Sequence, residues 1–147
     1  FESYFLNTAY DTRRLVDAVG HPNIRAMYDT FHANIEESNI GHAVTAMAPV
    51  LAHVHISENN RGTPGTGLVH WSDTFDALHA CKYEGWITIE AFGRSLPDLA
   101  AMCIWRPLYE SEMELAQEGL RFMRDGICAK WPAPYEQEAH IRSKSEG

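Results

Sequence analysis

The sequence has few cysteines, no long apolar run and few basic residues, and each shortage excludes a class of protein. Its three cysteines are odd in number and form no CxxC pair, which disfavours a secreted disulfide framework and favours a reducing cytoplasm. No apolar stretch approaches the ~20 residues needed to cross a bilayer, and the start lacks the basic and apolar segments of a signal peptide. We therefore expect a cytoplasmic protein with no membrane partner.

Acidic residues outnumber basic ones in this chain. There are 20 Asp and Glu against 12 Lys and Arg, so the formal net charge at pH 7 is −8. This balance opposes the basic surface with which nucleic-acid binders hold phosphates, so we expect no nucleic-acid partner. The 147 residues, of which 45% are hydrophobic, suffice for one ordinary domain with a packed core.

Helical and strand-like segments alternate along the chain. Helix signals include Thr8 as an N-cap and Gly20 as a stop, and Ser72 and Gly85 in the same two roles further on. Short runs rich in β-branched and aromatic residues indicate strands, whereas the polar residues 29–38 predict a loop. Helices are expected over 7–20, 40–51, 70–85, 97–105 and 110–126, and strands over 24–29, 51–57 and 86–93.

This alternation predicts an α/β fold in which about three parallel strands are covered by helices, because strands and helices in this order form βαβ units. Three strands do not close a barrel, and an eight-stranded (β/α)8 TIM barrel needs ~250 residues. The chain therefore fits part of such a barrel or a small open α/β layer. We assign residues 1–130 to this domain and the polar residues 131–147 to a loose tail.

Each expected strand ends near a side chain that can bind a metal ion, namely Asp29, His55 or Glu90. Because the carboxyl ends of parallel strands share one edge, residues distant in sequence become neighbours there, and His53 lies one layer below His55. Two carboxylates and an imidazole suit a divalent ion such as Mn²⁺, Mg²⁺, Co²⁺ or Zn²⁺. Singly, each residue also has a structural explanation: a helix-capping Asp, a buried hydrogen-bonded His and a Glu in an ion pair.

Three longer blocks of the sequence resemble a known enzyme family. MYDTFHANIEE (27–37), HVHISENNRGTPGTG (53–67) and WITIEAFG (86–93) closely resemble blocks of the D-tagatose 3-epimerase and D-psicose (allulose) 3-epimerase family. That family lies within the xylose-isomerase-like TIM-barrel superfamily. The resemblance runs over residues 1–126 and implies a partial (β/α)8 barrel, the C-terminal half, which lacks the N-terminal strands.

The resemblance also implies a reaction, the metal-dependent inversion of C3 in a free ketose sugar. One carboxylate removes the C3 proton, a divalent cation acts as a Lewis acid on the resulting enediolate, and a second carboxylate returns a proton on the opposite face. Manganese is the ion expected first, with Co²⁺ or Mg²⁺ as alternatives. Matched by position to the family, the metal ligands are Asp29, His55 and Glu90. Glu90 is also one of the two acid/base carboxylates. The residues that contact the substrate are Glu2, His32 and Arg61.

The match to the family has one gap. The family's fourth ligand, a glutamate that is also the second acid/base group, precedes the segment that begins here with Phe1, so we expect a fragment with weak metal binding and little epimerase activity. An open sheet exposes apolar faces and unpaired edges, so we also expect a homo-oligomer or pairing with a missing N-terminal half-barrel. Two alternatives stay open: a related hydroxypyruvate isomerase or inosose dehydratase, and a non-catalytic half-barrel module that oligomerises.

Overall fold

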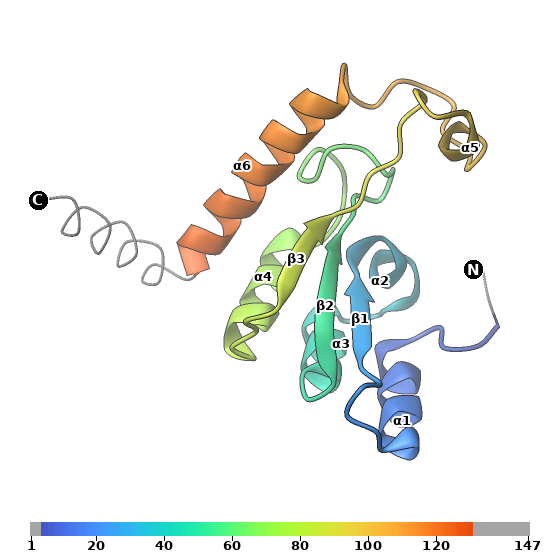
Figure 1. The fold of residues 1–147 in the computed structure, drawn as a ribbon. Coiled ribbons are helices and arrows are strands. Elements are labelled where there is room, and N and C mark those ends of the chain that lie inside the picture. The colour runs from blue at the N-terminus through green and yellow to red at the C-terminus, as the bar shows by residue number, and fades with distance from the viewer. Residues whose placement is uncertain (1–3, 131–147) are drawn as a thin grey trace, which may run out of the picture.

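The computed structural model describes residues 4–130, where three strands form one sheet accompanied by six helices (Figure 1). Glu2 and the expected tail at 131–147 lie outside the described residues. Within residues 4–130, no helix is both long enough and apolar enough to span a bilayer. In chain order the elements are α1 (Ala9–Val19), β1 (Ala26–Asp29), α2 (Thr30–Glu36), α3 (Ile40–Met47), β2 (Leu51–Ile56), α4 (Trp71–Ala80), β3 (Trp86–Ile89), α5 (Pro97–Ala100) and α6 (Glu112–Lys130).

The three strands are parallel and lie in the order β1-β2-β3. Asp29 of β1 pairs with His55 of β2, and Ile56 of β2 pairs with Ile89 of β3, so the strands end along one edge. The prediction of an α/β fold with three parallel strands is confirmed. Parallel strands connected through helices in this way occur both in (β/α)8 barrels and in open α/β sheets.

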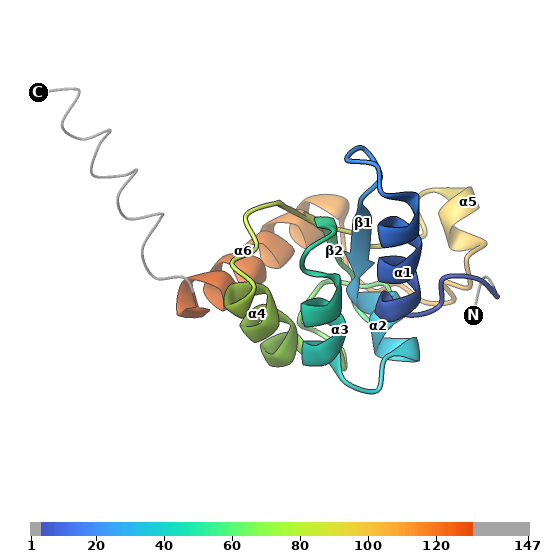
Figure 2. The same ribbon diagram turned by 90° about the horizontal axis from the view of Figure 1, so that it is seen from below.

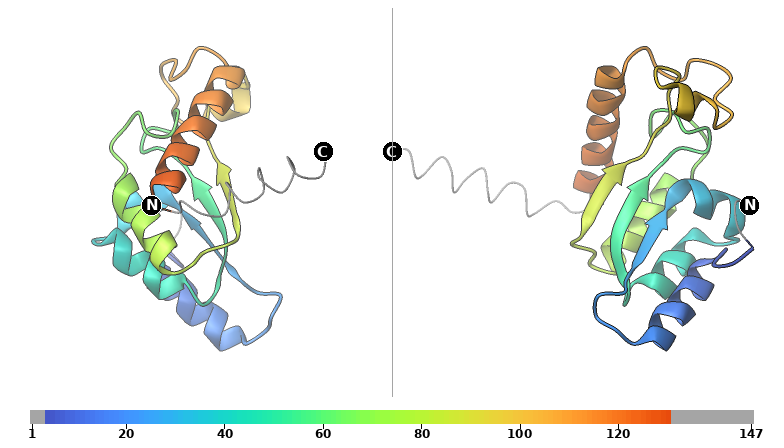
Figure 3. Two further views of the ribbon diagram at one scale, coloured as in Figure 1. Left: turned by 90° about the vertical axis from the view of Figure 1, so that its left-hand side faces the viewer. Right: turned by 45° about the vertical axis from the view of Figure 1, so that its right-hand side comes forward.

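Helices α1, α3, α4 and α6 lie on one face of the sheet, while α5 lies beyond the ends of the strands (Figure 3). Seen from below, α3 lies between α1 and α4 and contacts both, while α6 packs on α4 and β3 (Figure 2). Since side chains alternate along a strand, Tyr28, Val54 and Ile56 point into the helix layer and are buried. On the opposite face Met27 is 50% exposed and Trp86 is 79% exposed. Among the described residues, that face of the sheet is bare.

Helix α1 begins and ends where the sequence predicts. Thr8 caps its start, because Oγ1 accepts the N–H of Asp11 at 3.2 Å. Gly20 ends it in the left-handed region with φ 62°, and its N–H is donated to the carbonyl of Val16. A side chain at position 20 would be strained in that conformation, which is why glycine is the usual residue there.

The sequence predicts a loop over residues 29–38, and this prediction is wrong because Thr30–Glu36 form α2. Asp29 starts the helix: its Oδ1 accepts N–H bonds from Phe31 at 2.8 Å and His32 at 3.3 Å. The buried Thr30 then fixes the inner side of the helix, since its hydroxyl donates to the carbonyl of Ser57 at 2.7 Å. A single side chain at the end of β1 thus converts a polar segment into a helix.

The predicted boundaries of the helix over 70–85 are also wrong. Helix α4 begins one residue before Ser72, whose hydroxyl donates to Asp76 at 3.3 Å instead of capping the helix. It ends at Ala80 rather than at Gly85, and the chain then turns through Lys82 with φ 53°. The helix expected over 97–105 is helical only at Pro97–Ala100.

Truncation of Leu78 in α4 tests whether the core lies between the sheet and its helices. This side chain is fully buried, so Leu78→Ala is expected to lower the free energy of unfolding by ~2–5 kcal/mol through lost burial and a residual cavity. The matched control is Leu68→Ala, because Leu68 is 78% exposed and its truncation should change stability by less than ~0.5 kcal/mol. Urea unfolding measures both, and equal losses would contradict the described packing.

Candidate metal centre

Asp29, His55 and Glu90 meet at the carboxyl edge of the sheet. Each offers one ligand atom, and these atoms lie within 4.8 Å of one another. We call these three residues the triad. Each comes from the end of a different strand, and the parallel register brings them together although they are 26 or more positions apart in sequence.

Asp29 uses its two carboxylate oxygens differently. Its Oδ1 caps α2, whereas its Oδ2 lies 3.5 Å from Nδ1 of His55. The structural and the functional interpretations of this residue are therefore compatible, because the capping bonds leave the second oxygen facing the centre of the triad.

His55 presents a nitrogen without a hydrogen bond to any residue in the described range 4–130. Its Nδ1 is buried, and Oδ2 of Asp29 and Oε1 of Glu90 each lie 3.5 Å away. Because buried polar atoms nearly always have a hydrogen bond or a ligand, we expect a bound group next to this nitrogen. An imidazole nitrogen facing two carboxylate oxygens is a donor set that divalent metal ions accept, and the triad therefore fits such an ion.

The carboxylate of Glu90 is held in a crowded position. Partial burial raises its pKa above the usual range, and a hydrogen bond with Asp29 and the charge of Asp29 raise it further. The positive charges of Arg61 and His55 act in the opposite direction. Two carboxylates this close repel each other, and a cation between them relieves that repulsion.

Arg61 supplies positive charge beside the triad. Its Nη1 donates to Oε2 of Glu90 and, at 2.9 Å, to the hydroxyl of Ser57. The guanidinium carbon lies 3.5 Å from the ring centre of Phe31 and 4.6 Å from that of Phe92, so two aromatic rings hold the guanidinium. Although the residue carries a charge, it is only 7% exposed.

The backbone of Arg61 is strained. Its φ of 65° lies in the left-handed region, which a non-glycine residue rarely occupies without a compensating interaction. His32 lies beside the guanidinium, with Nε2 3.5 Å from Nη2 of Arg61. The structure thus brings His32 and Arg61 next to the triad, while Glu2 lies outside the described residues.

Sequence reasoning did not single out Phe31, Phe92 or Glu58. Phe31 and Phe92 each follow a triad residue, Asp29 or Glu90, by two positions, and both rings lie against the guanidinium of Arg61. That repeated spacing is a signal that was available in the sequence. Glu58 has no comparable signal, because its partners are backbone and indole N–H groups up to 13 positions away.

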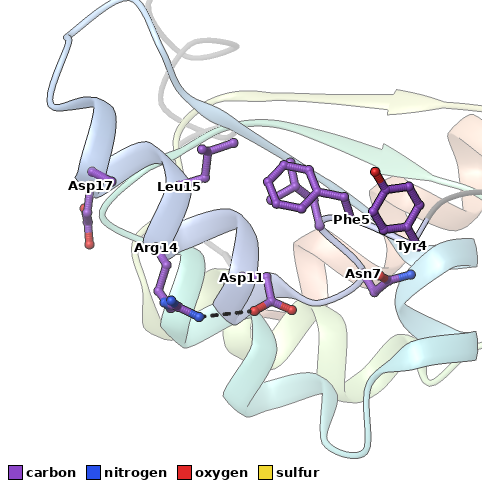
Figure 4. A pocket seen from close by; sticks show the side chains of 9 residues that line it. Tyr4, Phe5, Asn7, Asp11, Arg14, Leu15 and Asp17 are labelled. Atoms are coloured by element: carbon purple, nitrogen blue, oxygen red, sulfur yellow. Dashed lines mark ion pairs between the residues drawn. The ribbon is translucent and has the colours of Figure 1, made fainter.

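A groove of about 590 Å³ lies apart from the triad, between residues 4–7 and α1 (Figure 4). Aromatic Tyr4 and Phe5 line one side, and Arg14 and Asp11 of α1 line another, with their charged groups 3.8 Å apart. None of the triad residues lines this groove. A smaller cavity of about 190 Å³ does reach the site, where Asp29 and His32 form part of its wall.

Residues 1–126 match the family described as the xylose isomerase-like TIM barrel. An L-ribulose 3-epimerase from Methylomonas sp. is 36% identical over 127 residues, 84% of this chain and 44% of the relative. A ketose 3-epimerase from Arthrobacter globiformis is 36% identical over 132 residues, 88% of this chain and 46% of the relative. The crystal structure of a D-allulose 3-epimerase from Methylomonas sp. in complex with D-allulose has a TM-score of 0.80 at 36% identity, covering 85% of this chain and 44% of that chain. The chain spans less than half the length of these relatives.

The two roles of Asp29 can be separated in the metal-free protein. Asp29→Asn keeps a good helix cap, whereas Asp29→Ala removes it, and both remove one negative charge from the triad. The Ala variant is therefore expected to be less stable than the Asn variant by about 1 kcal/mol in urea unfolding. Indistinguishable stabilities would show that Asp29 does not start α2.

Proposed function

Because the chain belongs to the xylose isomerase-like TIM barrel family, we propose that it acts in the metal-dependent C3 epimerisation of free ketoses. The observation that carries this proposal is the meeting of Asp29, His55 and Glu90 within 4.8 Å, with Arg61 and His32 beside them. Similarity to ketose 3-epimerases supports the substrate class. Since the chain spans less than half of those relatives, the activity of the whole protein is itself part of the proposal.

The triad would hold the divalent ion through Oδ2 of Asp29, Nδ1 of His55 and a carboxylate oxygen of Glu90. We propose Mn²⁺, while Co²⁺ and Mg²⁺ suit a similar donor set. When bound, such an ion supplies Lewis acidity toward neighbouring sugar oxygens. The crowding of two carboxylates and the unbonded Nδ1 support this assignment.

Glu90 is the proposed acid/base group that takes the proton from C3. Partial burial and the charge of Asp29 raise the pKa of this carboxyl. A higher pKa lies closer to neutral pH, where a general acid/base group transfers protons efficiently. Arg61 and His32 are the proposed contacts to sugar oxygens, with Glu2 as a further contact outside the described residues. The two phenylalanine rings around Arg61 limit the directions in which its guanidinium can donate.

Inversion at C3 needs proton transfer on two faces of the sugar, and one carboxylate serves one face. Among residues 4–130, the triad offers Glu90 and the helix-capping Asp29 as its only carboxylates. The described residues therefore supply one half of an acid/base pair. A centre of this kind can take the C3 proton onto Glu90, where it is replaced by a hydrogen from the solvent, and then return that solvent hydrogen to the same face, which exchanges hydrogen without inverting the carbon.

Deuterium exchange tests this proposal directly. In D2O with Mn²⁺, the chain is expected to replace the C3 hydrogen of D-fructose with deuterium, seen as loss of the C3 proton signal in NMR, while little D-allulose forms. Glu90→Gln should lower the exchange rate by about 100-fold or more, the usual contribution of a positioned acid/base group.

Glu84→Gln is the matched control for this experiment, because Glu84 is exposed before the other end of β3 and should exchange at the wild-type rate. Exchange no faster than with Mn²⁺ in buffer would overturn the proposed function. Robust conversion to D-allulose by this chain would overturn the assignment of a single acid/base carboxylate.

The bare sheet face favours a second candidate function, a non-catalytic module that associates with a further copy of itself. Met27 and Trp86 are exposed there, and β1 and β3 have no strand beyond them among the described residues. The cysteine pattern supports a cytoplasmic location for either function.

The oligomeric state tests this second candidate. Trp86→Glu places a charge on the bare face of every copy and should reduce the mass measured by light scattering to about half, as expected for a dimer that dissociates. Leu68→Glu is the control, because Leu68 is exposed on the loop before α4 and should leave the mass unchanged. A wild-type chain that is already monomeric would exclude this candidate.

A further inference from the structure

Glu58 is a buried carboxylate that the proposed reaction does not use. It follows β2 by two residues, is fully buried, and accepts four N–H bonds. Its Oε1 accepts from the backbone of Asn59 at 3.0 Å and Val69 at 3.1 Å. Its Oε2 accepts from the backbone of Gly65 at 2.9 Å and from the indole of Trp71 at 3.0 Å. One side chain thus ties together the loop between β2 and α4.

Arg61 is carried on this same loop. Its N–H donates to the carbonyl of Glu58 at 2.9 Å, and its carbonyl accepts the N–H of Phe92 at 2.8 Å. The left-handed φ of 65° at Arg61 has to be maintained by the surrounding structure, because it is unfavourable for a residue with a side chain. The residues that donate to Glu58 lie on both sides of Arg61 in the sequence, so these bonds can hold the backbone of Arg61 in its left-handed conformation.

We propose that Glu58 is the positioning residue of the site: by binding four N–H groups of its loop, its carboxylate holds Arg61 between Phe31 and Phe92 and directs its guanidinium to Glu90. In the described structure the Glu58 carboxylate bonds to Asn59, Val69, Gly65 and Trp71 and makes no hydrogen bond or ion pair with the triad or Arg61, so it acts through the loop. The consequence for sugar binding rests on the proposed function, whereas the placement of Arg61 does not.

The chemistry of the four partners requires a carboxylate. All four are donors, and an ionised carboxylate has two oxygens that only accept. An amide at the same position would turn its NH2 group toward two of the donors in either orientation. Gly67 packs closely against this side chain, since a Cβ at position 67 would lie 2.7 Å from Cγ of Glu58.

Chemical modification of arginine tests the placement of Arg61 without any need for turnover. Phenylglyoxal reacts with accessible guanidinium groups, and peptide mass spectrometry gives the rate at each arginine. In the wild-type chain Arg61 should react slowly, because it is 7% exposed and lies between two rings. Glu58→Gln should raise that rate by about tenfold or more, since two charged hydrogen bonds are lost. Arg14 of α1, 68% exposed, is the internal reference and should not change.

Matched variants separate positioning from a general loss of stability. Val44→Ala truncates a fully buried side chain of α3 outside the loop, so it should destabilise the fold and leave the Arg61 rate unchanged. Trp71→Phe removes one of the four donors to Glu58 and should raise the modification rate of Arg61 by about threefold. If Glu58→Gln does not fold, this variant decides whether the loop positions Arg61. An unchanged Arg61 rate in the loop variants, or an equal rise in Val44→Ala, would overturn the proposal.

The deuterium-exchange assay adds the functional consequence. If Glu58 acts through Arg61, Glu58→Gln should slow exchange in the wild-type background and cause no further loss in an Arg61→Ala background. A further loss in the double variant would overturn the proposal. If no variant exchanges the C3 hydrogen, the proposed function fails, and the modification rates still decide whether Glu58 positions Arg61.

Discussion

Two carboxylates, from Asp29 and Glu90, lie against the same imidazole nitrogen at the edge of a parallel sheet, and the arrangement of the site depends on compensating their charge. His55 Nδ1 is 3.5 Å from each carboxylate and makes no hydrogen bond within the part of the chain that the structure describes. Arg61 brings a permanent positive charge to both carboxylates, and its guanidinium lies over the rings of Phe31 and Phe92. A divalent ion at the triad would add the remaining compensation and satisfy the unbonded nitrogen, so the metal site and the arginine are parts of one electrostatic arrangement.

The sequence predicts those features that depend on local chemistry and strand direction. Thr8 and Gly20 bound α1 because capping is a local property, and parallel strands place their last residues at one edge whatever the details of packing. The segment after Asp29 is different. Its polarity predicts a loop, yet an aspartate capping bond and the buried Thr30, which reaches Ser57 of the next βα unit, make it a helix.

The features that the sequence does not predict depend on contacts between distant residues. The left-handed backbone of Arg61 is rare for a residue with a side chain and is held here by hydrogen bonds with Phe92, 31 positions later, and with Glu58. The four donors to Glu58 meet only after the loop has closed. Position 65 is likewise restricted to glycine by a distant residue, because a Cβ there would lie 2.5 Å from the ring of Phe122 on α6. Such constraints follow from tertiary packing and leave no periodic signal in the sequence.

The central claim is that Asp29, His55 and Glu90 bind one divalent ion, and anomalous X-ray scattering from a crystal of this chain soaked in Mn²⁺ tests it most directly. The account predicts one anomalous peak within about 2.5 Å of His55 Nδ1 and of an oxygen of each carboxylate, in the range of divalent metal–ligand bonds. A fully occupied Mn²⁺ peak elsewhere on the chain, with none between these three side chains, would contradict it.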